Sequence, residues 1–143
     1  MTDIVLSTTE DKVFTDRLDQ LLDEHAIEAG FPFNNKTINL TAEIDGTFAG
    51  GLHAYTLYGW CFIKLLVIEP KHRGKGIGRD LMTRLETEMR SIGIKGLWVD
   101  TYGYQAEGLY TGLGFTEYGR LPGRVPEEDR IYLTKQLTGE PAP

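Results

Sequence analysis

The sequence has little cysteine, and this scarcity excludes one class of fold. Cys61 is the single cysteine among 143 residues, so no disulfide can form within the chain. A small secreted fold held together by disulfides is therefore excluded, and a reducing, cytoplasmic setting is the natural expectation. Cys61 lies in an apolar segment that predicts a strand, where we expect a buried, unreactive thiol rather than a nucleophile.

Long hydrophobic runs and metal-ligand clusters are also missing. No stretch approaches the roughly 20 apolar residues that a membrane-spanning helix needs. The N-terminus has no basic segment followed by an apolar run, so we expect neither a membrane span nor a signal peptide. The three histidines and one cysteine are scattered through the chain, and we therefore expect no metal site.

Positive charge is in deficit. The 15 Lys and Arg residues against 21 Asp and Glu residues give a formal net charge of −6, which argues against non-specific nucleic-acid binding. An acidic protein suits a cationic partner such as an amine, although acidity also serves solubility alone. A chain of 143 residues, 41% of them apolar, can bury a sizeable core. We expect one domain over residues 1–138 and a short polar tail over 139–143.

The strongest positive signal spans residues 65–81. The apolar run Leu65–Ile68 predicts a buried strand, which the following proline ends. A glycine-rich turn with basic side chains comes next. Apolar residues then recur at helical spacing from Ile77 to Ile92, and Gly93 predicts the end of the helix. The predicted order is strand, basic glycine loop and helix.

The loop and the helix N-terminus together predict a phosphate site. Their backbone N–H groups attract anions, and glycine lets a ligand come close to the main chain. No Lys-Ser or Lys-Thr follows a glycine here, which excludes a Walker A loop. The run Gly76-Ile77-Gly78-Arg79-Asp80-Leu81 lacks the third glycine of a dinucleotide fingerprint. An ordinary glycine turn with solvated basic side chains is the plain alternative.

The run Arg73-Gly74-Lys75-Gly76-Ile77-Gly78, preceded by Val67 and Pro70, resembles the R-x-x-G-x-G/A acetyl-CoA loop of the GNAT superfamily of N-acetyltransferases. The resemblance implies that acetyl-CoA binds here, with its thioester carbonyl against backbone N–H groups of the preceding strand. The cofactor-binding residues implied in this stretch are Leu66, Val67, Ile68, Arg73, Gly74, Lys75, Gly76, Ile77, Gly78 and Arg79.

A second stretch, residues 100–115, predicts a short helix that ends at Gly114. It is similar to the superfamily's A-x-x-L-Y-x-x-x-G-F motif, and the residues in register are Ala106, Leu109, Tyr110, Gly114 and Phe115. The resemblance implies that Tyr110 contacts the cofactor and protonates the departing CoA thiolate, a role that suits a phenol. Packing on the inner face of the helix is the alternative role for Tyr110.

This second stretch departs from the motif at one position. Gly103 stands where the superfamily often has an asparagine that contacts the pantetheine arm of the cofactor. The resemblance therefore makes Gln105 or Thr101 the expected substitute. A branch of the superfamily carries a similar Asp-Thr-aromatic-x-aromatic-Gln-Ala run.

The general base is not visible at its usual place. An alkyl ammonium titrates at about 10.4 and must lose its proton before or during attack. Many members of the superfamily use a glutamate on the strand before the glycine loop, where this chain offers Phe62 and Lys64. The remaining candidates are Glu43, His53 and Asp100, each acting directly or through water. The alternative for Asp100 is a purely structural role.

The other segments predict a mixed, mostly antiparallel sheet. The Asp45-Gly46 pair predicts a hairpin, and Gly50-Gly51 predicts a bulge or a close approach. Helices are expected from the capping box at Ser7 and Glu10 to about Gly30, from Ile77 to Gly93, and before Gly114. Strands are expected at Ile4–Ser7, Thr37–Glu43, Phe48–Leu57, Trp60–Ile68, Gly96–Thr101, Phe115–Leu121 and Arg130–Leu137.

The resemblance implies a GNAT-type α/β (α+β) fold, with about six to seven strands flanked by helices and one parallel pair splayed at the cofactor site. It also implies direct transfer of an acetyl group from acetyl-CoA to a primary amine of a small molecule or peptide, without a metal. An acetyl-CoA-binding sensor or assembly module without efficient turnover is one alternative, and an unrelated phosphate-binding domain is another. We expect no nucleic-acid or membrane partner. Many relatives form homodimers, and the sequence leaves the acceptor and the oligomeric state open.

Overall fold

The computed structural model describes residues 1–105 and 107–138. Ala106 of the second motif and the tail expected over residues 139–143 lie outside the described residues. The chain divides into two compact units, Met1–Phe33 and Asn34–Pro143. A single domain over residues 1–138 stays a prediction.

The first unit holds one helix, α1 (Lys12–Glu28). Its N-cap is Asp11, whose Oδ1 accepts a hydrogen bond from the Phe14 N–H at 3.0 Å. The capping box predicted at Ser7 and Glu10 is therefore wrong, because the helix begins one turn later. The strand predicted at Ile4–Ser7 is also wrong, since these residues lie outside helices and strands and the unit contains no second strand to pair with.

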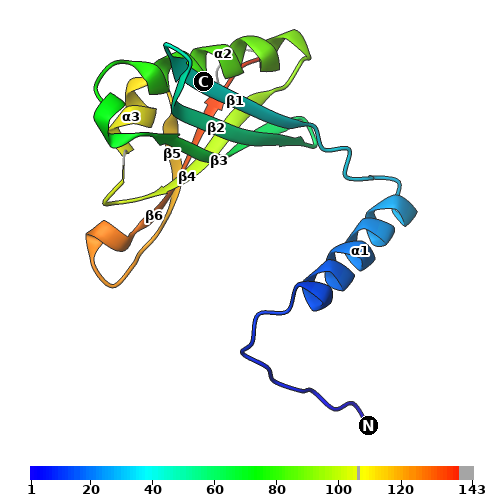
Figure 1. Ribbon diagram of the computed structural model, residues 1–143. Coiled ribbons are helices and arrows are strands. Elements are labelled where there is room, and N and C mark those ends of the chain that lie inside the picture. The colour runs from blue at the N-terminus through cyan, green and yellow to red at the C-terminus, as the bar shows by residue number, and fades with distance from the viewer. Residues whose placement is uncertain (106, 139–143) are drawn as a thin grey trace. The chain divides into compact units, whose positions relative to one another are not determined.

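The second unit is built on one sheet with the strand order β1-β2-β3-β4-β6-β5 (Figure 1). Every neighbouring pair is antiparallel except β3 and β4, which run parallel. The mixed, mostly antiparallel sheet with one parallel pair is confirmed. The strands of the described residues are β1 (Thr37–Ile44), β2 (Thr47–Leu57), β3 (Trp60–Ile68), β4 (Gly96–Tyr102), β5 (Thr116–Leu121) and β6 (Arg130–Gln136).

Helices connect the strands that are not joined by hairpins. The crossover from β3 to β4 runs through the short 3-10 turn η1 (Pro70–His72) and the long helix α2 (Ile77–Ser91), and α3 (Glu107–Gly112) lies between β4 and β5. A second 3-10 turn, η2 (Pro126–Glu128), lies in the loop between β5 and β6. No helix in the described part of the chain is long and apolar enough to cross a membrane.

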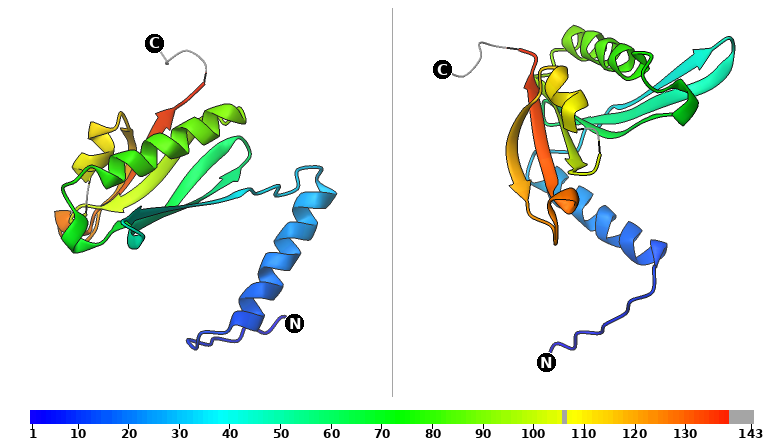
Figure 2. Two further views of the ribbon diagram at one scale, coloured as in Figure 1. Left: turned by 45° about the horizontal axis from the view of Figure 1, so that its top comes forward. Right: turned by 90° about the vertical axis from the view of Figure 1, so that its left-hand side faces the viewer.

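The core lies where α2 covers one face of the sheet (Figure 2). Leu81, Met82, Leu85 and Met89 recur at helical spacing and are all buried, as the sequence pattern predicts. The helix ends at the predicted glycine stop, where Gly93 has a φ of +77° and the Ile94 N–H donates to the Met89 carbonyl at 3.0 Å.

Cys61 belongs to this core on β3. Its side chain is fully buried, and burial raises the pKa of its thiol to about 11. The thiolate is the reactive form of cysteine, so this thiol is unreactive near neutral pH. The buried, inert cysteine expected from the sequence is confirmed.

The parallel pair β3–β4 splays apart part-way along its length. Only Trp60–Ile63 pair with Gly96–Val99, and the Phe62 and Trp98 rings stack at 4.0 Å between centroids just before the pairing ends. The register with β2 then shifts, because Ala54 pairs with Ile63 but His53 pairs with Leu65. This bulge at Lys64 bends β3 away from β4. The splayed parallel pair predicted from the family resemblance is confirmed.

The sequence predicted a bulge or close approach at Gly50-Gly51, and the close approach is confirmed at Gly50. A Cβ on Gly50 would lie 2.7 Å from the Val67 carbonyl oxygen and 2.8 Å from Ile68 Cδ1. The end of β3 therefore packs directly against the bare backbone of β2. This contact fixes the segment of β3 that precedes the glycine loop.

We expect Gly50→Ala to lower the free energy of unfolding by about 1–3 kcal/mol, because the added methyl group overpacks this contact. Urea denaturation measures the change. The matched control is Gly119→Ala in β5, where a Cβ would meet no atom within 4 Å, and we expect a change within about 0.5 kcal/mol. Equal effects of the two substitutions would contradict the role of the Gly50 contact.

Candidate active site

A cavity of about 900 Å³ lies between the end of β3, the start of α2 and the residues on either side of the α3 N-terminus. It gathers segments that are far apart in the sequence. Ten of the predicted cofactor-binding residues line it, namely Leu66, Val67, Ile68, Arg73, Gly74, Gly76, Ile77, Gly78, Arg79 and Gln105. Lys75, Thr101 and Tyr110, which were also predicted, do not line it.

The glycines of the loop are required by its backbone. Gly74 and Gly76 have φ values of +76° and +82°, in the left-handed region that favours glycine. A Cβ on either residue would meet no atom within 4 Å, so the space beside them is open. Gly76 is the N-cap of α2 and offers no side-chain cap, and the first N–H groups of a helix have no partner within it. The loop thus presents free backbone donors to the cavity.

Basic side chains surround these donors. The Arg73 Nε donates to the Ile68 carbonyl at 3.2 Å, which ties the loop to the end of β3. The Lys75 Nζ lies 3.5 Å from the His72 Nδ1, and Arg79 lines the cavity from the first turn of α2. Positive charge, free N–H groups and the positive end of the helix dipole together suit a phosphate or pyrophosphate.

The splay supplies a second set of donors. In an antiparallel pair, alternate residues of a strand direct their N–H groups to the partner, and the others point away. The segment Leu65–Ile68 pairs with β2 but has no pairing with β4. Its outward N–H groups therefore face the gap between the splayed strands, where a developing oxyanion could accept hydrogen bonds.

Tyr110 lies in α3 beside this region and is only 7% exposed. Its ring packs edge-on against Phe115, with 5.6 Å between ring centroids. Burial and the negative charge of Asp100 raise the pKa of Tyr110 to about 12. The phenol is therefore protonated at neutral pH, the form that donates a hydrogen bond or a proton.

Asp100 directly follows Val99, the last residue of β4 that pairs with β3. Its carboxylate accepts a hydrogen bond from Arg130 Nη2 at 2.8 Å, and this ion pair raises the pKa of the arginine. The Arg130 guanidinium also lies over the Tyr132 ring, 5.5 Å from its centroid. Asp100 thus lies at the start of the splay, and its carboxylate is already paired with Arg130.

Comparison with known proteins agrees with this geometry. The family model described as the Acetyltransferase (GNAT) family matches residues 5–115. The chain belongs to this acetyltransferase family. Acetyltransferase Atu2258 of Agrobacterium fabrum is 34% identical over 105 residues, which cover 73% of this chain and 77% of that protein.

Two further relatives support membership of the GNAT family. Blasticidin-S acetyltransferase of Streptomyces morookaense is 32% identical over 93 residues, which cover 64% of this chain and 68% of that protein. The crystal structure of a candidate acetyltransferase from Agrobacterium tumefaciens aligns with a TM-score of 0.85 at 27% identity, covering 94% of this chain and 99% of that one.

The three candidate bases lie at different places in this GNAT acetyltransferase. Asp100 lies at the splay on β4. His53 lies on β2, on the far side of β3 from Asp100, where its Nδ1 is 2.7 Å from Asn39 Oδ1. Glu43 lies on β1 and lines a different cavity of about 450 Å³ together with Asp80. The structure therefore brings Asp100 to the splay and leaves Glu43 at another site.

Sequence reasoning missed four residues of the GNAT site. His72, Tyr104 and Leu109 line the cavity. His72 and Tyr104 are close sequence neighbours of motif residues, and Leu109 is itself a residue of the second motif for which no cofactor contact was predicted. Arg130 is 30 residues away from Asp100. Only the pairing of β4 with β6 brings the two together, and no local sequence pattern predicts this contact.

We expect Asp100→Asn to lower the pKa of Tyr110 from about 12, because the nearby negative charge that disfavours the phenolate is removed while burial remains. NMR titration of the tyrosine ring carbons, with Tyr110→Phe to assign the signal, measures this shift. Asp45→Asn in the β1–β2 turn is the control and should leave the titration unchanged. An unaltered pKa in Asp100→Asn would show that this carboxylate does not act on Tyr110.

Proposed function

We propose that the protein transfers the acetyl group of acetyl-CoA to a primary amine of a small molecule or peptide, directly within a ternary complex. The observation that carries the proposal is the single cavity that joins a basic glycine loop to a splayed strand. A phosphate-bearing thioester has the two matching parts, an anionic group for the loop and a carbonyl for the strand.

The residues present suit acetyl-CoA. Arg73, Arg79 and the N–H groups around Gly76 would hold the pyrophosphate. The apolar side chains of Leu66, Ile77 and Leu109 would flank the arm that leads to the thioester. An aminoglycoside 6'-N-acetyltransferase with the same fold, with a TM-score of 0.64 at 22% identity, was solved in complex with coenzyme A.

The protein's own groups account for the steps of the transfer. The outward N–H groups of Leu66–Ile68 donate to the carbonyl oxygen as it gains negative charge. Tyr110, protonated at neutral pH, supplies a proton to the thiolate that leaves when the amine attacks. Binding both reactants side by side provides proximity. Asp100 is the candidate that accepts the amine proton, directly or through water, because it stands at the splay.

Small molecules are the favoured class of acceptor. Curated relatives are named for blasticidin-S and IAA, and the net charge of −6 suits a cationic amine. A homodimer is compatible with the family resemblance.

Two observations favour a second candidate function, an acetyl-CoA-binding sensor or assembly module without efficient turnover. β3 carries Phe62 and Lys64 where a glutamate base is usual, and the Asp100 carboxylate is already engaged by Arg130. Such a module would bind acetyl-CoA without transferring the acetyl group. Turnover assays across polyamines, aminoglycosides and amino acids distinguish the two functions.

We expect calorimetric titration to show selective binding of acetyl-CoA over ATP and NAD, and Gly76→Glu to abolish it. The substitution places bulk and negative charge at the open N-terminus of α2, where the pyrophosphate would lie. Gly46→Glu is the matched control, because Gly46 has a similar φ of +78° in an open hairpin turn and does not line the cavity. A folded wild type that does not bind acetyl-CoA would overturn the proposed function.

We expect Tyr110→Phe to lower kcat by about 10²-fold or more with an accepted amine, while the calorimetric affinity for acetyl-CoA changes little. Loss of a positioned general acid affects the reaction step rather than ground-state binding. A coupled thiol-release assay measures kcat, and Tyr118→Phe on the exposed strand β5 is the control. An unchanged kcat in Tyr110→Phe would leave that tyrosine with a packing role alone.

A further inference from the structure

The ion pair between Asp100 and Arg130 lies on the face of the sheet that α2 does not cover. Val99 of β4 and Ile131 of β6 are buried in the core that α2 completes. Successive side chains of a strand point to opposite faces, so Asp100 and Arg130 both lie on the other face. The Asp100 Oδ2 accepts a hydrogen bond from the Arg130 Nη2 at 2.8 Å. A negative and a positive group therefore lie side by side at the start of the splay.

Asp100 uses only a small part of the hydrogen-bonding capacity of Arg130. A guanidinium carries five N–H donors in a planar fork, and among residues 1–105 and 107–138 Asp100 is the only hydrogen-bond acceptor for them. The Arg130 Nε is buried and has no partner in this part of the chain. The side chain of Arg130 is 41% exposed. The guanidinium therefore keeps N–H donors that a second anion can reach from the solvent.

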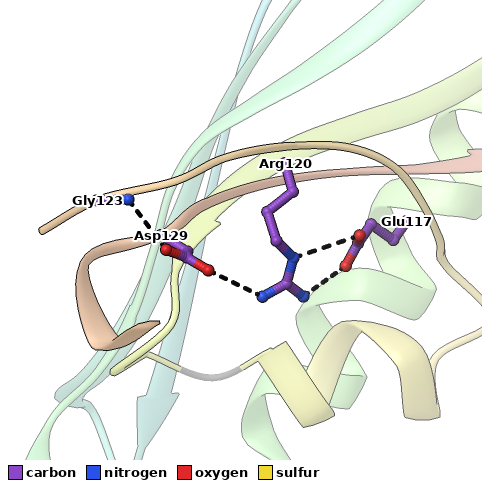
Figure 3. A network of polar contacts seen from close by, with 4 residues as sticks. All are labelled: Glu117, Arg120, Gly123 and Asp129. Atoms are coloured by element: carbon purple, nitrogen blue, oxygen red, sulfur yellow. Dashed lines mark hydrogen bonds and ion pairs between the residues drawn. The ribbon is translucent and has the colours of Figure 1, made fainter. Parts of the chain in front are cut away.

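A polar network fixes the chain immediately before Arg130 (Figure 3). Arg120 of β5 donates through Nη2 to Glu117 Oε1 at 2.6 Å and through Nη1 to Asp129 Oδ2 at 3.4 Å. The other carboxylate oxygen of Asp129, Oδ1, accepts a hydrogen bond from the Gly123 N–H at 2.9 Å. The carboxylate of Asp129 is thus engaged by other groups and does not pair with the neighbouring Arg130.

The β5–β6 loop also packs against the end of β4, opposite Arg130. A Cβ on Gly103 would overlap the Pro126 carbonyl oxygen, and the Gly103 N–H donates to the Asp129 carbonyl at 2.9 Å. The ladder between β4 and β6 ends with Tyr102 opposite Arg130. The backbone on both sides of the ion pair is therefore held in place before a ligand binds, which lowers the ordering cost of binding.

The ion pair is complementary to a zwitterion. An amino acid carries an ammonium and a carboxylate close together. The ammonium suits Asp100, and the carboxylate suits the remaining N–H donors of Arg130, because a guanidinium fork matches the geometry of a carboxylate. A polyamine or an aminoglycoside would bring further positive charge toward Arg130, and like charges in contact are unfavourable. The charges at the splay therefore favour a zwitterionic acceptor over a polycationic one.

We infer that the acceptor is an amino acid, and that Arg130 selects it by binding its carboxylate while Asp100 receives its ammonium. The inference rests on the proposed function and specifies the acceptor.

The transfer then balances as follows. A bond forms between the amine nitrogen and the carbonyl carbon, and the bond from that carbon to sulfur breaks. The ammonium gives one proton to Asp100 or to water, and from there it passes to the solvent. The second proton that the nitrogen loses replaces the one that Tyr110 gives to the thiolate. The products are an N-acetyl amino acid and coenzyme A with a free thiol.

The test measures thiol release from acetyl-CoA by the full chain with matched acceptors. Each standard amino acid is paired with its amide, which keeps the amine and the side chain but lacks the carboxylate, and spermidine and kanamycin are the polycationic comparisons. We expect kcat/KM for the accepted amino acid to exceed that for its amide by about ten- to a hundredfold, the contribution of a hydrogen bond between charged groups.

Arg130→Gln tests the residue itself. The substitution removes the positive charge and the fork, so we expect the preference for the amino acid over its amide to fall by about tenfold or more. Any effect of the change on Asp100 acts on both members of a pair, and the ratio therefore isolates recognition of the carboxylate. Arg124→Gln is the matched control, because Arg124 pairs with Glu128 and is 89% exposed, and it should keep the preference. Thermal unfolding checks that both variants are folded.

The outcomes separate the two proposals. A wild type that does not bind acetyl-CoA in calorimetry, or that binds it and acetylates no amine on the panel, overturns the proposed function and this inference with it. Turnover of spermidine or kanamycin without turnover of any amino acid overturns this inference alone, and so does equal turnover of an amino acid and its amide. A folded Arg130→Gln variant that keeps the full preference overturns the assignment of the carboxylate to Arg130.

Discussion

The site depends on the early end of the pairing between β3 and β4. Up to Ile63 and Val99 the two strands are held as a parallel pair, with Phe62 stacked on Trp98. The bulge at Lys64 then turns β3 away. Had the ladder continued, its hydrogen bonds would have used the outward N–H groups of Leu66–Ile68 and closed the gap. The splay therefore creates the donors, and it leaves Asp100 at the opening.

Much of the proposed binding chemistry comes from backbone rather than side chains. The open N-terminus of α2, the left-handed glycines before it and the unpaired edge of β3 all present N–H groups in fixed directions. Such groups cost little reorganisation when a ligand binds, because the fold has already oriented them. The side chains then add charge at Arg73 and Arg79, a buried phenol at Tyr110 and an oriented amide at Gln105.

The β5–β6 loop constrains the segment at Gly103. The network around Arg120 is partly exposed, and each of its ion pairs contributes little to stability. Its effect is geometric, because it holds the loop against Gly103. The same contact explains why a glycine occupies position 103.

Short-range sequence patterns account for the local elements of the fold. Helical spacing from Leu81 to Met89, the stop at Gly93 and the glycine loop are set by near neighbours, and all are present in the structure. Local signals failed at Ile4–Ser7, because a strand needs a partner that its own residues cannot supply. Long-range packing brings Arg130 to Asp100, places the β5–β6 loop beside Gly103 and makes Gln105 part of the cavity lining. Those contacts depend on strand pairing between distant segments, for which the sequence carries no short-range pattern.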